Sequence, residues 1–292
     1  MIIVKPLTGI DIAIINSAWQ DAFKDYPVSW TKTDIEKMLV RRGYVPELSF
    51  GAFEGDELVS FTLNCVGEYD GMLSAYDTGT GTRPAFRGRS LAARIFHAAE
   101  PFLKQQNIKQ YILDVMQDNT NAIAVYKKQG LQITREFNYF VLPADELHLP
   151  DKALSEGYQV KEIEFPGREI MQHMWDFHPA WQNSIESVLR VPADIKYIGA
   201  FAGDTLAGYG ITAYESGDIT QIAVDQGHRR QGIGTAILRA MLALNTAPRV
   251  KAIATDVDCA SINLFLEACG LPRKGCLYEM IKELDPQTSF QL

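Results

Sequence analysis

Cysteine is scarce in this chain, and the residues present show no spacing that suits a metal or a disulfide framework. They stand at Cys65, Cys259, Cys269 and Cys276, with no C-x-x-C pair and no zinc-like spacing to any of the five histidines. Sparse, irregular cysteines are typical of reduced thiols in a cytosolic protein. We therefore expect free thiols and no metal site.

Long apolar runs are also missing. No segment approaches the roughly twenty consecutive apolar residues of a membrane-spanning helix. The N-terminal segment MIIVKPLTGIDIAII lacks the apolar region and the small-residue cleavage site of a secretory signal. We expect a cytoplasmic protein with no membrane partner.

An excess of positive charge is absent as well. The formal net charge is −8, whereas a protein that follows nucleic-acid phosphates needs a basic surface. This balance excludes nucleic acid as the expected partner. It slightly favours a cationic substrate such as an amine, but it does not identify one, and it leaves the oligomeric state open.

The chain has enough length and enough apolar residues for two separate cores. Its 292 residues would be long for one ordinary domain, and hydrophobic residues make up 47% of them. Charged residues account for 22%, which is typical of a soluble globular protein. The composition therefore favours two domains of similar size.

Three segments occur twice, in the same order. GAFEGDELVS at residue 51 matches GAFAGDTLAG at residue 199, and both read as two strands joined by a Gly-Asp turn. RPAFRGRSLAARIF matches QGHRRQGIGTAIL, which places Arg87 opposite Arg229. DNTNAIAVYKKQGL, ending at Leu131, matches DCASINLFLEACGL, ending at Leu271. Three collinear matches indicate a duplicated domain.

The repeat defines the expected domain boundaries. We expect an N-terminal domain over 1–145 and a C-terminal domain over 157–292, with the polar, proline-bracketed segment 146–156 as the linker. Each copy reads as a strand, one or two helices, antiparallel strands, a loop, and then helix, strand, helix and strand. The expected fold class is therefore α/β, with a mixed sheet in each copy.

A loop in the second copy has the features of a phosphate cradle. An apolar strand ends at Val224, and an amphipathic helix begins near Gly232. Gly232 and Gly234 allow the backbone to approach an anion closely, and the first N–H groups of the helix point towards it. Arg229 and Arg230 add positive charge. The sequence has neither the G-x-x-x-x-G-K-[ST] motif of a P-loop nor the complete G-x-G-x-x-G of a dinucleotide-binding domain.

This loop resembles the R/Q-x-x-G-x-G/A signature of the GNAT N-acetyltransferase superfamily. The second copy reads Arg229-Arg-Gln-Gly-Ile-Gly234, and the first reads Arg87-Gly-Arg-Ser-Leu-Ala92. The first copy departs from the signature at Ser90, where glycine is expected. The resemblance spans the whole chain in two blocks, and it implies two tandem GNAT domains that use acetyl-CoA.

The last matched segment also resembles a family motif, roughly N-x-x-A-I-x-L-Y-x-x-x-G-F. The first copy has Asn119 where the family residue contacts the cofactor arm, and Tyr126 where the family acid protonates the departing thiolate. A phenol with an ordinary pKa of about 10 stays protonated at neutral pH and suits that role. Taken alone, Tyr126 would be read as a packed helix-face residue; within this motif the packing and the catalytic interpretations both stand. The second copy has Cys259 and Leu266 at these two positions.

The resemblance implies a cofactor site in each copy, with the acyl carbonyl held by backbone N–H groups near Thr82 and Val224. Direct attack by the amine then requires no covalent enzyme intermediate. The implied cofactor-binding residues are Thr82, Arg87, Gly88, Arg89, Ser90, Leu91, Ala92, Asn119, Val224, Arg229, Arg230, Gln231, Gly232, Ile233, Gly234 and Thr235.

Aromatic and amide residues in the first helical region of each copy are candidate substrate contacts. They are Tyr26 and Trp30 in the first copy, and Trp181, Gln182 and Asn183 in the second. Aromatic walls with polar handles suit a small-molecule or peptide amine. The same residues also suit a core or a domain interface. Asp77, shortly before the first loop, is a candidate base for the incoming ammonium or a turn residue.

Two functions follow from these observations. The first is an N-acetyltransferase that moves an acetyl group from acetyl-CoA to a primary amine, with Tyr126 and Asp77 as its catalytic residues. The second is an acyl-CoA-binding sensor or scaffold in which one or both domains are silent. Ser90 and Leu266 are the residues that support the second function.

Overall fold

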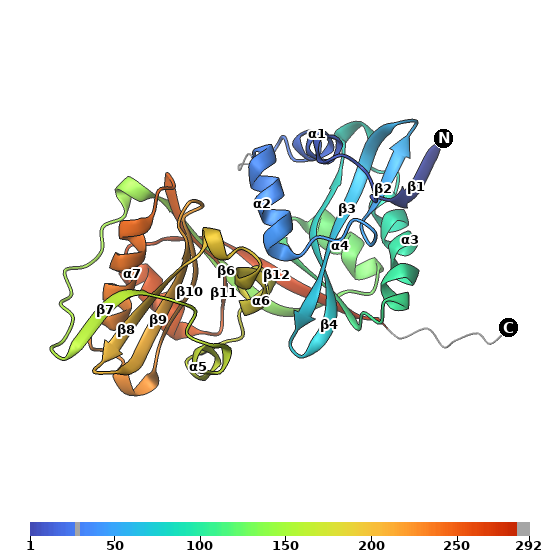
Figure 1. The fold of residues 1–292 in the computed structure, drawn as a ribbon. Helices are drawn as coiled ribbons and strands as arrows, with labels where there is room; N and C mark the ends of the chain where they lie inside the picture. Colours follow the sequence, from blue (N-terminus) through green and yellow to red (C-terminus); the bar gives the residue numbers. More distant parts are fainter. Residues whose placement is uncertain (27–29, 285–292) are drawn as a thin grey trace. The chain divides into compact units, whose positions relative to one another are not determined.

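A computed structural model describes residues 1–26 and 30–284 of the chain, which fold into two compact units (Figure 1). The first unit contains Met1–Thr134 together with the chain from Tyr278 onward, and the second contains Arg135–Leu277. Each unit combines a mostly antiparallel sheet with helices. The expected α/β class with a mixed sheet is confirmed.

The first unit has the strand order β1-β2-β3-β4-β5-β12. Neighbours pair antiparallel from β1 to β4, whereas β4 and β5 are parallel. The strands are β1 (Ile2–Pro6), β2 (Phe50–Glu54), β3 (Glu57–Tyr69), β4 (Met72–Thr82), β5 (Gln110–Met116) and β12 (Arg273–Glu283).

Helices lie on both sides of this sheet. They are α1 (Ile12–Ala22), α2 (Lys32–Arg42), α3 (Leu91–Gln105) and α4 (Thr120–Lys128). Figure 1 shows α1 and α2 on one side of the strands and α3 on the other. Local sequence explains where α2 begins and ends, because Thr31 and Asp34 form a capping box and Gly43 takes the left-handed conformation after the last turn.

The second unit repeats this arrangement, with the strand order β6-β11-β10-β9-β8-β7. Its strands are β6 (Gln132–Pro143), β7 (Tyr158–Ile163), β8 (Lys196–Ala202), β9 (Thr205–Ala213), β10 (Asp218–Val224) and β11 (Arg249–Asp256). Its helices are α5 (Arg168–His173), α6 (Ile185–Leu189), α7 (Ile233–Leu244) and α8 (Ala260–Ala268). A short 3-10 turn, η3 (Trp181–Asn183), precedes α6.

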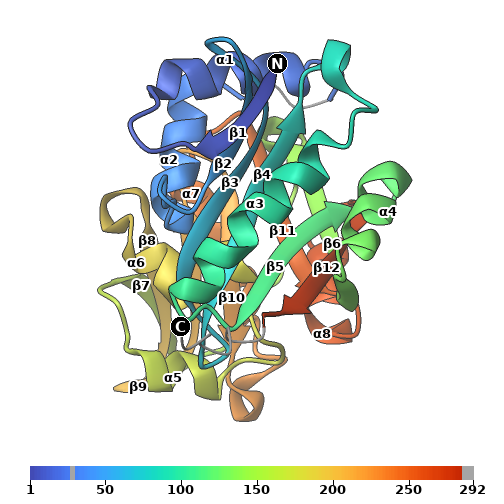
Figure 2. The same ribbon diagram turned by 90° about the vertical axis from the view of Figure 1, so that its right-hand side faces the viewer.

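The last strand of each sequence copy lies in the unit formed by the other copy. β6 ends the first copy and pairs antiparallel with β11, from Pro143 opposite Arg249 to Phe137 opposite Asp256. β12 ends the second copy and lies beside β5 (Figure 2). The compact units therefore differ from the expected domains 1–145 and 157–292, because each sheet is completed by a strand from the other copy.

The exchanged strand β12 contributes to the core of the first unit. Met280 and Leu284 are buried there in a cluster with Leu103 and Leu113. The Leu284 N–H also donates to the carbonyl of Lys109 over 2.7 Å. This part of the first core cannot form from residues 1–145 alone.

No helix in the described part of the chain is both long enough and apolar enough to cross a membrane. The four cysteines occur as free thiols.

Candidate active site and cofactor site

The two predicted cofactor loops share one backbone shape, although their residues differ. In the first unit, Gly88 and Ser90 have φ angles of 76° and 55°; in the second, Arg230 and Gly232 have φ angles of 67° and 81°. Left-handed residues therefore stand at equivalent places. Ser90, the departure from the signature, adopts the conformation that glycine adopts in the second loop.

An arginine anchors each loop in the same way. Arg87 donates through Nε to the carbonyl of Thr82 over 3.3 Å, and Arg229 donates through Nε to the carbonyl of Val224 over 3.0 Å. The other guanidinium nitrogens of the two arginines have different partners. Arg87 donates to the Ala22 carbonyl, whereas Arg229 forms a 2.8 Å ion pair with Asp176. Both predicted arginines therefore shape the loop.

The two parallel strands of each unit separate as they approach this loop. Pairing of β4 with β5 ends at Asp77 opposite Leu113, although both strands continue. In the described part of the second unit, one pair, Asp218 and Lys251, joins β10 to β11. In both units a β-bulge directly follows the last parallel pair, and residues of both strands beyond it are left without a parallel partner.

A cavity of about 680 Å³ fills the opening in the second unit. It is lined by Ile219–Val224 of β10, Ala252–Thr255 of β11, and Gly232–Thr235 at the start of α7. Arg229 and Arg230 also line it. The strand opening, the helix N-terminus and the two cations predicted from the sequence therefore meet at one cavity.

Asp176, which was not predicted, joins two sides of this cavity. Its carboxylate accepts from Arg229 over 2.8 Å and from the Ser261 hydroxyl over 2.7 Å. Burial raises the pKa of Asp176, but the bonds from Arg229 and Ser261 outweigh burial and lower it overall. The carboxylate therefore stays charged and keeps Arg229 in place. No sequence motif marked Asp176.

Tyr126 and Asp77 come together in the first unit, at the point where β4 and β5 separate. The Thr80 hydroxyl donates to Asp77 over 2.6 Å, and the Thr80 side chain also acts on Tyr126, whose pKa it lowers. Asp77 accepts a second bond from the Gly79 N–H over 2.9 Å. Thr80 therefore links the two candidate catalytic residues.

The surroundings shift the pKa of both groups upward. Burial raises the pKa of Asp77 to about 6, although the bonds from Thr80 and Gly79 act against it. Burial raises the pKa of Tyr126 well above its ordinary value, and the nearby charge of Asp77 raises it further. At neutral pH the arrangement holds a protonated phenol next to a carboxylate that titrates near neutrality.

Asn119 is the N-cap of α4. Its side-chain oxygen accepts from the Ala122 N–H over 3.2 Å, and its amide donates to the Tyr26 hydroxyl over 3.0 Å. Tyr26, a predicted substrate contact, is 46% exposed. Trp30, the other candidate in this unit, lies edge-on to Trp19 and accepts through its carbonyl from Gln20.

The substrate candidates of the second unit are buried residues of η3. Trp181 is 2% exposed, and Gln182 and Asn183 are both 8% exposed. Only Asn183 lines the cavity. Its carbonyl accepts from Gln221 of β10 over 2.6 Å, and its amide donates to the Ile253 carbonyl of β11 over 2.7 Å. Asn183 therefore bridges the two separated strands.

Leu266 occupies the position of Tyr126 in the second unit and is fully buried. Cys259 occupies the position of Asn119, lines the cavity, and makes no side-chain cap for α8. Its thiol lies 3.3 Å from the Ser261 hydroxyl. The cavity of the second unit therefore has no tyrosine acid at the position equivalent to Tyr126.

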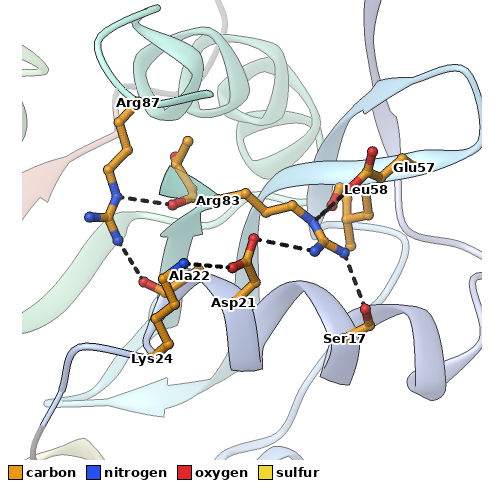
Figure 3. A network of polar contacts seen from close by, with 9 residues as sticks. Ser17, Asp21, Ala22, Lys24, Glu57, Leu58, Arg83 and Arg87 are labelled. Carbon is orange, nitrogen blue, oxygen red and sulfur yellow. Dashed lines mark hydrogen bonds and ion pairs between the residues drawn. The ribbon is translucent and has the colours of Figure 1, made fainter. Parts of the chain in front are cut away.

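Arg83 at the end of β4 is a further residue that sequence reasoning missed. It donates through Nε to the Leu58 carbonyl over 2.8 Å and through Nη2 to Ser17 over 3.2 Å, and it forms ion pairs with Asp21 and Glu57 (Figure 3). These contacts tie the first loop to α1 and β3. A lone arginine after a strand gives no sequence signal for such a role.

The family follows from a comparison with known proteins. The model of the acetyltransferase (GNAT) family matches the chain twice, over residues 15–131 and 156–271. These two ranges cover most of the chain, so it belongs to this family of acyltransferases and carries two tandem copies of the fold. No curated protein sequence matches the chain.

Solved structures share the two-domain fold. A GCN5-related N-acetyltransferase from Sphaerobacter thermophilus has a TM-score of 0.75 at 14% identity, covering 98% of this chain and 96% of its own. A tandem GNAT protein from the clavulanic acid biosynthesis pathway has a TM-score of 0.72 at 15% identity, covering 98% and 100%. A protein from Pyrococcus horikoshii described as a putative acetyltransferase has a TM-score of 0.70 at 17% identity, covering 98% and 90%. At these identities the likeness concerns the fold alone.

Proposed function

We propose that this protein transfers an acetyl group from acetyl-CoA to a primary amine of a small molecule or peptide, and that the reaction takes place in the first unit. The observation that carries the assignment to the first unit is the Tyr126–Thr80–Asp77 group where β4 and β5 separate. The cofactor supplies the activated acyl carbon. All other steps use side chains of this unit.

Asp77 takes a proton from the incoming ammonium, which frees the nitrogen lone pair for attack. A carboxyl with a pKa of about 6 is a better base than an ordinary aspartate and is still mostly ionised at pH 7. Tyr126 donates its proton to the sulfur as the carbon–sulfur bond breaks, and the phenolate regains a proton from the nitrogen as the amide forms. Its raised pKa keeps the phenol protonated until that step.

The second unit suits the cofactor but not this chemistry. Its cavity of about 680 Å³ lies within the roughly 300–1,000 Å³ that ligand pockets occupy, and the first turn of α7 opens onto it. Leu266 replaces the tyrosine acid, and Asn183 bridges the strands. We therefore propose that the second unit binds CoA without turnover, which retains the sensor or scaffold function for this half of the chain.

The proposal is tested by thiol release. The purified chain is mixed with acetyl-CoA and a panel of polyamines, amino sugars and amino acids, and free CoA thiol is measured. We expect at least one amine to raise thiol release above the rate of hydrolysis. If acetyl-CoA binds and no amine raises the rate, the transferase proposal is wrong and the binding function replaces it.

A further inference from the structure

We propose that the segment between the two copies is part of the second unit's cofactor site, in which Lys152 binds a phosphate group of CoA. This inference rests on the proposed use of CoA by that unit. The sequence alone assigned residues 146–156 only as a linker.

The segment lies directly against the second cofactor loop. The Ser155 N–H donates to the Gln231 carbonyl over 3.0 Å. A Cβ placed on Gly232 would stand 2.3 Å from the Ala153 carbonyl oxygen, so the two backbones are in contact. The Pro150 carbonyl accepts from Arg239 of α7 over 3.2 Å. The segment is therefore held at both the loop and the helix.

The direction of the Gln231 bond shows which side of the loop the segment covers. In a planar trans peptide, the carbonyl and the following N–H point in opposite directions. Because Ser155 binds the Gln231 carbonyl, the N–H of Gly232 points away from Ser155. An anion at a helix N-terminus binds on the N–H side. The segment therefore supports the loop from behind and leaves the anion-binding side open.

Lys152 is an exposed residue of this segment. It lines the same cavity as Arg229, Arg230 and Gly232. Burial raises the pKa of the Cys269 thiol, whereas a hydrogen bond from Thr235 and the charges of Lys152 and Arg239 lower it. Since Thr235 belongs to the first turn of α7, the Lys152 charge acts near the start of this helix. Three cationic side chains, Lys152, Arg229 and Arg230, thus line the cavity onto which the start of α7 opens, in a chain whose net charge is −8.

The two cofactor loops differ in whether another segment of the chain packs over them. Arg87, Gly88, Arg89 and Ser90 are exposed in the first unit, whereas Gly232 is buried beneath Ala153 and Leu154 in the second. The shared loop shape is therefore combined with a supporting segment in only one of the two described units. We therefore expect the second unit to bind a phosphate of CoA with Lys152, a residue outside the family signature.

Hydrogen–deuterium exchange during a CoA titration tests the proposal, since peptides over 226–240 report on the second unit alone. We expect Lys152→Ala to weaken the apparent affinity about fivefold, which is the effect of one partly exposed ion pair. The loss should shrink at high salt. Lys161→Ala is the matched control, because Lys161 is exposed in β7 of the same unit and does not line the cavity. Its affinity should stay within about twofold of the unmodified chain.

A second titration with 3′-dephospho-CoA identifies the phosphate. If Lys152→Ala weakens the binding of CoA but not that of 3′-dephospho-CoA, Lys152 binds the 3′-phosphate. If it weakens the binding of both ligands equally, Lys152 binds the pyrophosphate. Unchanged affinity of Lys152→Ala for both ligands, with the melting temperature retained, overturns the proposal. If CoA protects no peptide over 226–240 in the unmodified chain, the proposed cofactor use of this unit fails instead.

Discussion

Tyr126 and Asp77 illustrate what single residues contribute to this molecule. They belong to α4 and β4, and neither is near the other in sequence. Their shared contact with Thr80 and their raised pKa values arise because α4 lies beside the place where β4 separates from β5. Three predictions belong to this scale.

Replacing Tyr126 by Phe should remove the proton donor and leave the shape of the site unchanged. We expect kcat to fall about 100-fold, the lower range for loss of a general acid, with CoA affinity nearly unchanged. Thiol release measures the first quantity and calorimetric titration the second. Tyr214→Phe, in the second unit, is the matched control. Full activity of Tyr126→Phe would remove Tyr126 from the mechanism.

Asp77 should control the pH dependence of the reaction. Its pKa of about 6 means that turnover rises with pH through this value as the base ionises. Asp77→Asn should lower kcat and abolish this rise. A rate profile between pH 5 and pH 8 that is the same in both proteins would argue against Asp77 as the base.

Ionisation of Asp77, which should raise turnover as pH rises, should lower the stability of the folded chain over the same pH range. A folded pKa of about 6, raised from 3.8, means that the folded state binds the proton more tightly than the unfolded state, so stability falls as pH rises from about 4 to above 6. At pH 7.5, Asp77→Asn should therefore raise the free energy of unfolding by about 1–3 kcal/mol. The gain should vanish near pH 4. Urea denaturation at both pH values measures it.

At the scale of elements, the two cofactor loops reach one shape by different means. The signature places glycine at 232 and 234, but only Gly232 has a positive φ, of 81°. Gly234 serves a different need, because a Cβ there would lie 3.1 Å from the Phe265 ring. Ser90 takes the left-handed conformation in the first loop at a cost of about 1–2 kcal/mol.

Reciprocal substitutions in the loops should therefore have opposite effects. Gly232→Ala places a Cβ 2.3 Å from the Ala153 oxygen, so it should displace the segment 147–156 and weaken CoA binding to the second unit. Ser90→Gly relieves strain and should raise the free energy of unfolding by about 0.5 kcal/mol. Hydrogen exchange and denaturant unfolding measure these effects. A Gly232→Ala chain with normal exchange over 147–156 would contradict the contact.

At the scale of the whole molecule, the exchange of β6 and β12 makes each unit depend on both copies. Lys282 of β12 forms a 3.0 Å ion pair with Glu100 of α3, and Met280 and Leu284 fill the first core. Burial raises the pKa of Glu100, but its bonds to Lys282 and Lys104 lower it overall. The first unit therefore gains both apolar area and charge pairing from residues 280–284.

Separating the copies should expose this dependence. We expect fragments 1–145 and 146–292, produced apart, to melt at lower temperature than the intact chain and to expose apolar surface. Mixed together, they should recover much of the lost stability, because each supplies the strand that completes the other's unit. Calorimetry of the fragments alone and combined is the measurement. A fragment 1–145 as stable as the intact chain would show that β12 contributes little.

Much of this protein follows from sequence because the relevant signals are local. The collinear repeats determined two copies, the apolar periods determined a mixed α/β fold, and the Arg-x-x-Gly-x-Gly pattern determined the loop before α7. Tyr126 and Asp77 were recognisable as candidates because each stands at a fixed place relative to these segments. The boundaries 1–145 and 157–292 describe the copies that the repeats define.

Tertiary structure decided the rest, because pairing partners and close contacts depend on residues far apart in the chain. The final strands of the two copies have equivalent positions, so no local property states which sheet each will join. The contact of Ala153 with Gly232 and the ion pair of Asp176 with Arg229 likewise follow from no period or motif. Only the packed molecule brings Lys152 to the cofactor loop, and Met280 and Leu284 to the first core.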